Sequence, residues 1–475
     1  MAVEHVFRWA KETPDRTALI QYGEHLSYGE FARWIALARG YFNRLGWKGP
    51  GYVAVAIAEL STAWITMLAL RSLGLTTIVL RHPAGVGDLP LPGLRVVTVE
   101  AETWPGLEEA CGIHGIELLT VAPDNETPLP LDAGKPAPMG GHILETSGTT
   151  GLKKMVLMDP AFEGEYLRLR RELTGIDAGS IVAVFNFHAN TGVGYKAPTN
   201  VWTVGGAVAF QQSHDLRETL RIPGLTHASM VPSMLLSVLE APVGSFPFQP
   251  AMTLSITGGT ITQAQIDAAK ARIAPRLLNG LGATESHTIA STELNTPDDH
   301  RWHTIAPKSQ VEIVDENDRP VATGEIGRLR VGAAGAPSGY LFDEAATRAF
   351  FKHGFFYTGD LAMARADGRI ALHGRVTEVI NMYGHKIAPA PIEDRLRETL
   401  GVGGVCLFSM QNDNGEEGLH AIIETPAAID TGRLAAAFRA EHIGDVHVHF
   451  VAALPRNAMG KLMRQDAKAA ILQRL

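Results

Sequence analysis

The sequence predicts an α/β protein with a large N-terminal domain of doubly wound sheets, a β-rich subdomain and a small α+β C-terminal domain. Short apolar runs alternate with segments of helical spacing, a pattern typical of parallel strands joined by helices. From Val311 the pattern changes to short strands separated by turn sequences such as DENDRP and ADGR. The 475 residues, 45% of them hydrophobic and 19% charged, suffice for two or three globular domains.

The N-terminal part predicts helices and strands in alternation. Residues 29–46 place Phe31, Ile35 and Phe42 on one side of a helix. Frequent proline between Pro83 and Pro138 favours long surface connections there. In order, the expected elements are helices at 2–12 and 29–46, the strand VAVAI, a helix ending near Leu73, and the strands TTIVL, RVVTVE and IELLTVA.

The middle of the chain continues the strand–helix units, whereas its C-terminal part does not. The expected strands are SIVAVFNF, GGAVAF, THASMV and LSITGG, each followed by a helical segment, and then RLLNGLGATES. Beyond Val376, a smaller α+β unit is expected, with helices at 390–400 and 431–441 and a hairpin between them. We therefore predict one domain at 1–375 and a second at 376–475.

Charge, cysteine content and hydropathy narrow the class of protein. The net charge of −8 argues against a nucleic-acid partner, which favours a basic surface. Cys111 and Cys406 are the only cysteines and lie far apart, so neither a disulfide framework nor a zinc site is predicted. Glu59 and Arg71 interrupt the longest apolar stretch, and the N-terminus lacks an apolar signal core. We expect a cytoplasmic protein without a membrane span, monomeric or homodimeric.

The segment LETSGTTGLKK at 144–154 concentrates hydroxyl groups, glycines and lysines. Gly148 and Gly151 allow the backbone to approach a ligand closely, and the hydroxyls and lysines suit phosphoryl oxygens. Leu152 follows the second glycine where a P-loop has lysine, so a P-loop kinase is excluded. Taken alone, the segment fits a polar surface turn as well as a phosphate-binding loop.

Three further segments carry candidate chemistry. In NGLGATES, Glu285 follows a glycine-rich turn, where a carboxylate can hold a metal ion beside a phosphate. In FFYTGD, Asp360 can accept both hydroxyls of a ribose, with Arg375 to reinforce the contact. In LPRNAMGKLMR, Lys461 follows a glycine. Each residue alone fits a helix cap, a turn or a solvated charge equally well.

The motifs TSGTTG, GGT, GLGATE, YTGD, GR and GK, in this order, resemble those of the adenylate-forming superfamily. That superfamily contains acyl- and aryl-CoA ligases, peptide-synthetase adenylation domains and luciferases, and the resemblance runs from PDRTALI to GKLMR. It implies a mobile C-terminal domain and an AMP-forming acid–thiol ligase. The implied cofactors are ATP, Mg²⁺ and CoA, or the phosphopantetheine of a separate carrier protein.

The resemblance assigns roles around the nucleotide. The phosphate loop comprises Thr146, Ser147, Gly148, Thr149, Thr150, Gly151 and Lys154. Gly258, Gly259 and Thr260 lie along the adenine, as do Leu281 and Gly282, and Asp360 and Arg375 bind the ribose. The predicted catalytic residues are Thr284 and Glu285 at the α-phosphate and Mg²⁺, Lys461 between the carboxylate and the α-phosphate, and His188. Thr377 matches the hinge, and Tyr383–Gly384 lines the thiol tunnel.

The segment FNFHANTGVGY at 185–195 matches the floor of the acid pocket. His188 matches a gating aromatic residue, although a histidine packed in the core would fit as well. Ala189 stands where enzymes for α-amino acids have aspartate, so an α-amino acid is not expected. The small residues Ala189, Thr191, Gly192 and Gly194 leave room for an aryl or a medium or long alkyl acid. The pocket residues are His188, Ala189, Thr191, Gly192, Gly259 and Gly282.

The acceptor stays open between CoA, which we expect first, and a separate carrier protein. A further alternative is a nucleotide-binding relative that forms no thioester. Four positions depart from the family pattern: Leu281 replaces an aromatic residue, Lys153 a proline, Met155 a glycine and Glu145 an apolar residue. The loss of stacking at Leu281 predicts weaker nucleotide affinity.

Overall fold

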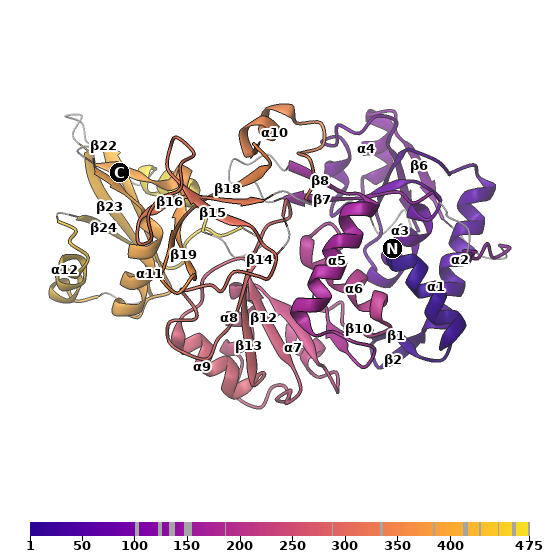
Figure 1. Cartoon of the computed structure of the whole chain (residues 1–475), viewed down its shortest axis with the longest axis horizontal. Helices are drawn as coiled ribbons and strands as arrows, with labels where there is room; N and C mark the ends of the chain where they lie inside the picture. Colours follow the sequence, from indigo (N-terminus) through magenta and orange to yellow (C-terminus); the bar gives the residue numbers. More distant parts are fainter. Residues whose placement is uncertain are drawn as a thin grey trace.

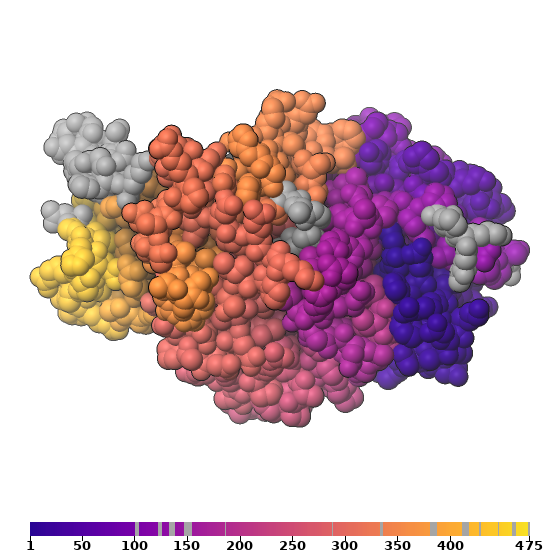
Figure 2. Space-filling model, viewed as in Figure 1, coloured from indigo at the N-terminus to yellow at the C-terminus, as the bar shows by residue number. Residues whose placement is uncertain are grey.

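The computed structural model describes the chain except residues 100–103, 122–125, 133–137, 147–153, 186, 287, 333–335, 383–384, 412–416, 427–428, 445, 458–461 and 474–475. Figure 1 shows an elongated molecule in which the N-terminal part forms one end and the C-terminal part the other. In Figure 2, residues of the β-rich segment (orange) lie between these two ends. In the described ranges, no helix combines the length and the apolar character that crossing a membrane requires.

An eight-stranded sheet forms the centre of the N-terminal part and confirms the predicted α/β class. Its strand order is β14-β13-β12-β11-β9-β10-β1-β2, and only the edge strands β2 and β14 run antiparallel to their neighbours. Its strands are β1 (Thr17–Gln21), β2 (Glu24–Ser27), β9 (Ile181–Ala183), β10 (Ala207–Phe210), β11 (His227–Met230), β12 (Thr253–Thr257), β13 (Arg276–Gly282) and β14 (Thr288–Glu293). Its crossover helices are α6 (Gly192–Val204), α7 (Leu216–Leu220), α8 (Pro232–Glu240) and α9 (Gln263–Arg272).

A second, six-stranded sheet has the order β6-β5-β3-β4-β7-β8, with only β8 antiparallel. Its strands are β3 (Tyr52–Val55), β4 (Thr76–Val79), β5 (Arg95–Thr98), β6 (Glu117–Thr120), β7 (His142–Thr146) and β8 (Lys154–Met158). The accompanying helices are α1 (Ala2–Glu12), α2 (Tyr28–Arg44), α3 (Leu60–Arg71), η1 (Pro83–Val86), α4 (Leu107–Ile113) and α5 (Pro160–Thr174).

One apolar core joins the two sheets. The buried ring of Trp64 on α3 packs edge-on against Trp202 of α6 and Phe210 of β10, with centroids 5.5 and 5.1 Å away. Phe31 of α2 lies 5.0 Å from Trp202. Because these aromatic rings belong to strand β10 and to helices that pack on both sheets, burying them fixes the sheets relative to each other.

The predicted β-rich subdomain is a five-stranded sheet around Leu329 and Ala362. It contains β15 (Val311–Val314), β16 (Ile326–Gly332), α10 (Glu344–Phe350), β17 (Phe351–Lys352), β18 (Phe355–Ala364) and β19 (Ile370–Arg375). The chain then continues through η3 (Val376–Glu378), β20 (Ile380–Met382), β21 (His385–Ile387), α11 (Pro389–Leu400), β22 (Gly404–Gln411), β23 (Glu417–Glu424), α12 (Thr431–Ala440), β24 (Val446–Val451) and α13 (Arg464–Leu472).

The C-terminal elements bury an apolar cluster of their own, which includes Leu396, Leu407 and Phe438. The domain boundary at 375/376 nevertheless stays a prediction. Helix α11 also contacts the N-terminal part. Arg301 forms an ion pair with Glu398 at 2.6 Å, and the Thr260 hydroxyl donates a hydrogen bond to the Asp394 carboxylate at 3.3 Å.

Candidate active site

The predicted site segments follow the carboxyl ends of parallel strands in the eight-stranded sheet. The segment with His188 follows β9, the Gly258 turn follows β12, and the Glu285 turn follows β13. Parallel strands present their carboxyl ends at one edge, so these turns lie along one side of the sheet. The second sheet meets the same edge, because the Glu145 backbone N–H at the end of β7 donates to the Asn190 carbonyl at 3.3 Å.

The turn before α6 has a backbone held by several hydrogen bonds. Thr191 caps the helix: its hydroxyl accepts from the Gly194 N–H at 3.1 Å and donates to the His188 carbonyl at 2.8 Å. A Cβ on Gly194 would lie 2.2 Å from that carbonyl oxygen, so only glycine fits there. The buried His142 contacts the Ala189 carbonyl through Nε2 at 2.7 Å. The predicted acid-pocket residues therefore sit on a rigid turn.

Two histidines near this turn are held neutral. Burial, reinforced by Arg81, lowers the pKa of the half-buried His188. Burial, and next Arg71, lowers the pKa of His142 to about 3. A neutral imidazole at His188 can face an apolar acid without the cost of a buried charge. Sequence reasoning did not select His142, although a histidine inside the apolar strand HILET is a visible signal.

The turn after β12 is exposed and touches the C-terminal part. Gly258 adopts a φ of +88°, a conformation that favours glycine, and a Cβ on Gly259 would lie 3.1 Å from Pro232 Cγ at the start of α8. Thr260 is exposed and bonds Asp394 of α11. Thr260, one of the residues predicted to lie along the adenine, therefore also contacts α11.

Glu285 is the buried carboxylate of the site. It is 8% exposed, and its Oε1 accepts a hydrogen bond of 2.7 Å from the Tyr340 hydroxyl. Burial, followed by the charge of Glu285, raises the pKa of Tyr340, so the phenol stays protonated and donates. Lys154 Nζ lies 5.1 Å from the Tyr340 ring centroid and 3.9 Å from that of Phe350. Tyr340 thus brings Lys154 and Glu285 together, and sequence reasoning missed it.

The donor set around Glu285 fits Mg²⁺ held mainly by a nucleotide. Mg²⁺ is commonly bound by one or two carboxylates together with substrate phosphates. Glu285 supplies such a carboxylate and accepts a hydrogen bond from the neutral Tyr340, and no cation among the described residues forms an ion pair with it. Across the described ranges, no cluster of three or more His, Cys, Asp or Glu side chains could hold a metal.

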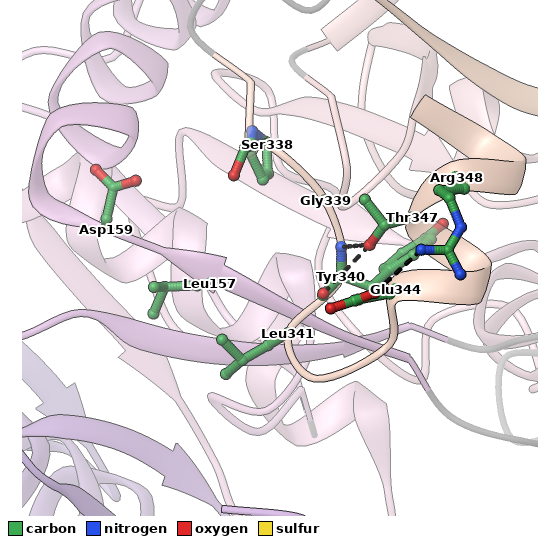
Figure 3. Close-up of a pocket in the computed structure, with 10 residues that line it drawn as sticks. Leu157, Asp159, Ser338, Gly339, Tyr340, Leu341, Glu344, Thr347 and Arg348 are labelled. Carbon is green, nitrogen blue, oxygen red and sulfur yellow. Dashed lines mark hydrogen bonds and ion pairs between the residues drawn. The ribbon is translucent and has the colours of Figure 1, made fainter. Parts of the chain in front are cut away.

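A pocket beside this cluster shows how Tyr340 is positioned (Figure 3). It has a volume of about 340 Å³ and lies between β8, the loop at 337–341 and α10. The Tyr340 N–H donates to the Thr347 hydroxyl at 2.9 Å, which ties the loop to α10. The lining contains none of the residues predicted from the sequence. The hydrogen bond to Thr347 therefore holds the Tyr340 loop against α10 at this pocket.

Asp360 and Arg375 are directly paired across β18 and β19. Arg375 Nε lies 3.0 Å from Asp360 Oδ1, and its Nη1 donates to the Thr358 carbonyl at 2.8 Å. The Asp360 N–H donates to the Thr358 hydroxyl at 3.1 Å. These contacts fix the carboxylate at the end of the site nearest the C-terminal part.

The remaining predicted residues fall into two groups. Thr146 ends β7 opposite Lys154, and the exposed Thr377 lies in η3, between β19 and β20. Outside the described residues lie Ser147, Gly148, Thr149, Thr150, Gly151, Lys153, Tyr383, Gly384 and Lys461.

Two of the departures from the family pattern serve packing. Met155 is 6% exposed in the core of the six-stranded sheet, so its side chain adds apolar packing that a glycine would lack. Leu281 packs against the cluster of the β-rich subdomain that contains Ile313 and Ile370. Glu145 accepts a hydrogen bond of 3.4 Å from Asn190 Nδ2, so it helps to join the two sheets.

Comparisons with known proteins indicate which family of proteins the chain resembles. Residues 142–341 match the family described as AMP-binding enzyme. The recognition of the adenylate-forming superfamily from its motifs is thereby confirmed. The ATP-bound RpMatB–BxBclM chimera B3 is similar in fold over 100% of both chains, with a TM-score of 0.83 at 18% sequence identity.

Curated relatives include enzymes that act on different acids. The chain is 27% identical over 310 residues to a salicylyl-CoA synthase / salicylate adenylyltransferase of a Streptomyces species, covering 61% of this chain and 55% of the relative. It is 25% identical over 506 residues to 2-succinylbenzoate–CoA ligase of Bacillus licheniformis, covering 98% and 99%. The chain thus spans about half the length of the first relative.

Proposed function

We propose that the protein activates a carboxylic acid with ATP to an acyl-adenylate and then transfers the acyl group to CoA. The observation that carries this proposal is the convergence of the Glu285 turn and the His188–Gly192 turn at one sheet edge. A Cβ on Gly192 would lie 3.9 Å from the Thr284 hydroxyl, so the proposed acid and phosphate sites adjoin. The similarity to two relatives named for CoA thioester formation supports the choice of acceptor.

The proposed first step joins a carboxylate oxygen of the acid to the α-phosphorus and breaks the bond to the β-phosphate, releasing pyrophosphate. The acid is already ionised at neutral pH, so no general base is required. Bound Mg²⁺ supplies positive charge against the phosphates, and Glu285 would hold it. Lys461 lies between the two anions in this proposal, and the Asp360 carboxylate accepts the ribose hydroxyls.

The second step transfers the acyl group from AMP to a thiol. In this proposal the domain at 376–475 turns about Thr377, which removes Lys461 and brings Gly384 to the thiol tunnel. Ala189 provides no carboxylate for an ammonium group, which supports an aryl or alkyl acid over an α-amino acid. The alternative acceptor is the phosphopantetheine of a separate carrier protein.

ATP–pyrophosphate exchange with a panel of acids tests the first step. We expect exchange with at least one aryl or alkyl acid and none with α-amino acids. Product analysis with CoA, or with a phosphopantetheinylated carrier, then identifies the acceptor. If no acid supports exchange while ATP still binds, the protein is a nucleotide-binding relative and the proposal is wrong.

Replacing Lys461 with alanine should separate the two steps. We expect adenylation to fall by about 10²-fold or more, because a charge that offsets the developing anion is lost. Thioester formation from supplied acyl-AMP should be largely retained, since the proposed second step does not use this lysine. Unchanged pyrophosphate exchange would refute the assigned role.

Replacing Asp360 with alanine should weaken ATP binding. Loss of charge-assisted hydrogen bonds to the ribose is expected to raise the KM for ATP about 10-fold. The KM for the acid should stay unchanged, because Asp360 lies on β18 in the β-rich subdomain. The matched control is Asp343→Ala, which removes a helix-capping carboxylate near the loop of Tyr340. Equal ATP dependence in wild type and Asp360→Ala would contradict the ribose role.

A further inference from the structure

A buried lysine lies on α6, the helix that follows the proposed acid-pocket turn, and no described residue is its counter-ion. Lys196 on α6 is 6% exposed. Its ammonium rests on the Tyr166 ring of α5, with Nζ 4.3 Å from the ring centroid. Among the described residues it has neither a hydrogen-bond acceptor nor a carboxylate within ion-pair distance. A buried charge is costly unless it is paired, so we expect this lysine to bind an anion.

The position of Lys196 on α6 directs it toward the proposed reaction centre. Gly192, Lys196 and Asn200 are spaced by four residues, so they share one face of the helix. Gly192 on this face adjoins Thr284. The Lys196 ammonium lies over Tyr166 of α5, the helix that packs beside α6. Burial lowers the Lys196 pKa, and the Glu285 charge raises it by a smaller amount.

The same helix face carries a second anomaly. Asn200 is completely buried, and no residue in the part of the chain that the structure describes bonds its Oδ1 or its Nδ2. Buried amides in folded proteins are nearly always satisfied, so an unpaired one indicates a missing ligand or water. Lys196 and Asn200 are therefore two buried polar residues on one face of α6, which lies side by side with α5 (Figure 1).

The charged side chains near Lys196 favour an anionic ligand. Arg170 lies on the other side of Tyr166, and its Nη1 donates to the phenol oxygen at 3.0 Å. Burial, moderated by Tyr166, lowers the pKa of Lys196, and Arg170 lowers it further. Glu163, the buried carboxylate nearest to Lys196 in the sequence, already forms an ion pair with Arg71 at 2.6 Å. Lys196 and Arg170 thus both contact Tyr166, and among the described residues neither forms an ion pair with a carboxylate.

We propose that Lys196 and Asn200 bind a second carboxylate on the acid substrate, so that the enzyme activates dicarboxylic acids. This inference rests on the proposed function, because it uses the acid pocket at His188–Gly192. Lys196 lies one helical turn, about 5–6 Å, beyond Gly192. A linear or aromatic acid with its carboxylates at opposite ends matches that separation. The ammonium and the amide N–H groups donate to the distal carboxylate while the other carboxylate reacts.

Matched pairs of acids test the proposal: adipate against hexanoate, and terephthalate against 4-methylbenzoate. In acid-dependent pyrophosphate exchange, we expect wild type to favour a dicarboxylate over its partner at least tenfold in kcat/KM. Lys196→Met should lower kcat/KM for the dicarboxylate about 10- to 100-fold, the effect of one charge-assisted contact. Its value for the monocarboxylate should stay the same or rise. The exposed Lys48→Met is the matched control.

A binding experiment without turnover distinguishes a failure of this proposal from a failure of the proposed function. In calorimetry with no ATP present, the dicarboxylate should bind wild type and lose at least tenfold in affinity with Lys196→Met. If such binding occurs but no acid supports exchange, the proposed function fails and the subsite stands. If monocarboxylates support exchange and dicarboxylates neither bind nor react, the subsite is refuted and the function stands. An equal loss for both acids in Lys196→Met also refutes the subsite. Should that variant not fold, wild-type discrimination decides alone.

Discussion

Replacing Glu285 with glutamine is expected to slow acid-dependent pyrophosphate exchange by about 10²- to 10³-fold, the largest catalytic effect among the described residues. The carboxylate is 8% exposed and bonded to Tyr340, so glutamine can occupy its place without a void. The substitution removes a negative charge from a buried position that would hold Mg²⁺ against the phosphates. Initial rates at saturating ATP and acid, across a range of Mg²⁺ concentrations, measure this effect.

The control for this variant is Glu344→Gln on α10. Glu344 is 88% exposed, and its one ion pair among the described residues is with Arg348 of its own helix, so its loss should leave exchange unchanged. Excess Mg²⁺ should recover part of the activity of Glu285→Gln if the carboxylate acts through the metal. A variant as active as wild type at every Mg²⁺ concentration would remove Glu285 from the proposed mechanism.

Replacing Arg71 with alanine is expected to lower the free energy of unfolding by about 3–5 kcal/mol. Arg71 and Glu163 are 0% and 1% exposed, and their side chains form an ion pair at 2.6 Å. Arg71 also donates to the Gly140 carbonyl at 3.0 Å and to the Tyr195 hydroxyl. Its removal leaves a buried carboxylate without a cation. Urea denaturation followed by tryptophan fluorescence measures the change.

Two comparisons show whether burial causes this effect. Arg348→Ala breaks an ion pair with side chains 73% and 88% exposed, and should cost at most about 0.5 kcal/mol. The double variant Arg71→Met with Glu163→Met removes both charges and should recover much of the lost stability. A loss below about 1 kcal/mol for Arg71→Ala would show that water or another residue compensates Glu163.

The sequence predicts most of the parallel strands, because buried parallel strands are short apolar runs between helices, but it misses the parallel strands β1 and β7. It does not predict the edge strands β2 and β14, whose residues EHLS and TIASTE are largely polar. Helix α5 is also missed, since the charged residues of PAFEGEYLRLRRELT narrow its apolar stripe. Edge strands and surface helices derive their stability from neighbours that are distant in the sequence.

For the candidate site, local motifs predict the turns at Gly258, Glu285 and Asp360 because each is a contiguous stretch at the end of a strand. The partners of these turns are not local. Tyr340 is separated from Glu285 by 55 positions, and no motif marks it. Lys196 is likewise an isolated lysine in the sequence, and only its burial distinguishes it from a solvated one. Chemistry that depends on burial requires the folded chain.

The contact between Thr260 and Asp394 has a consequence for the energetics of the nucleotide. Under the proposed assignment, the adenine and α11 share one small turn. If docking of α11 strengthens or weakens nucleotide binding, then nucleotide binding changes the free energy of α11 docking by the same amount, because linkage is reciprocal. ATP would then act as an effector of domain position as well as a substrate, and AMP release would depend on where α11 rests.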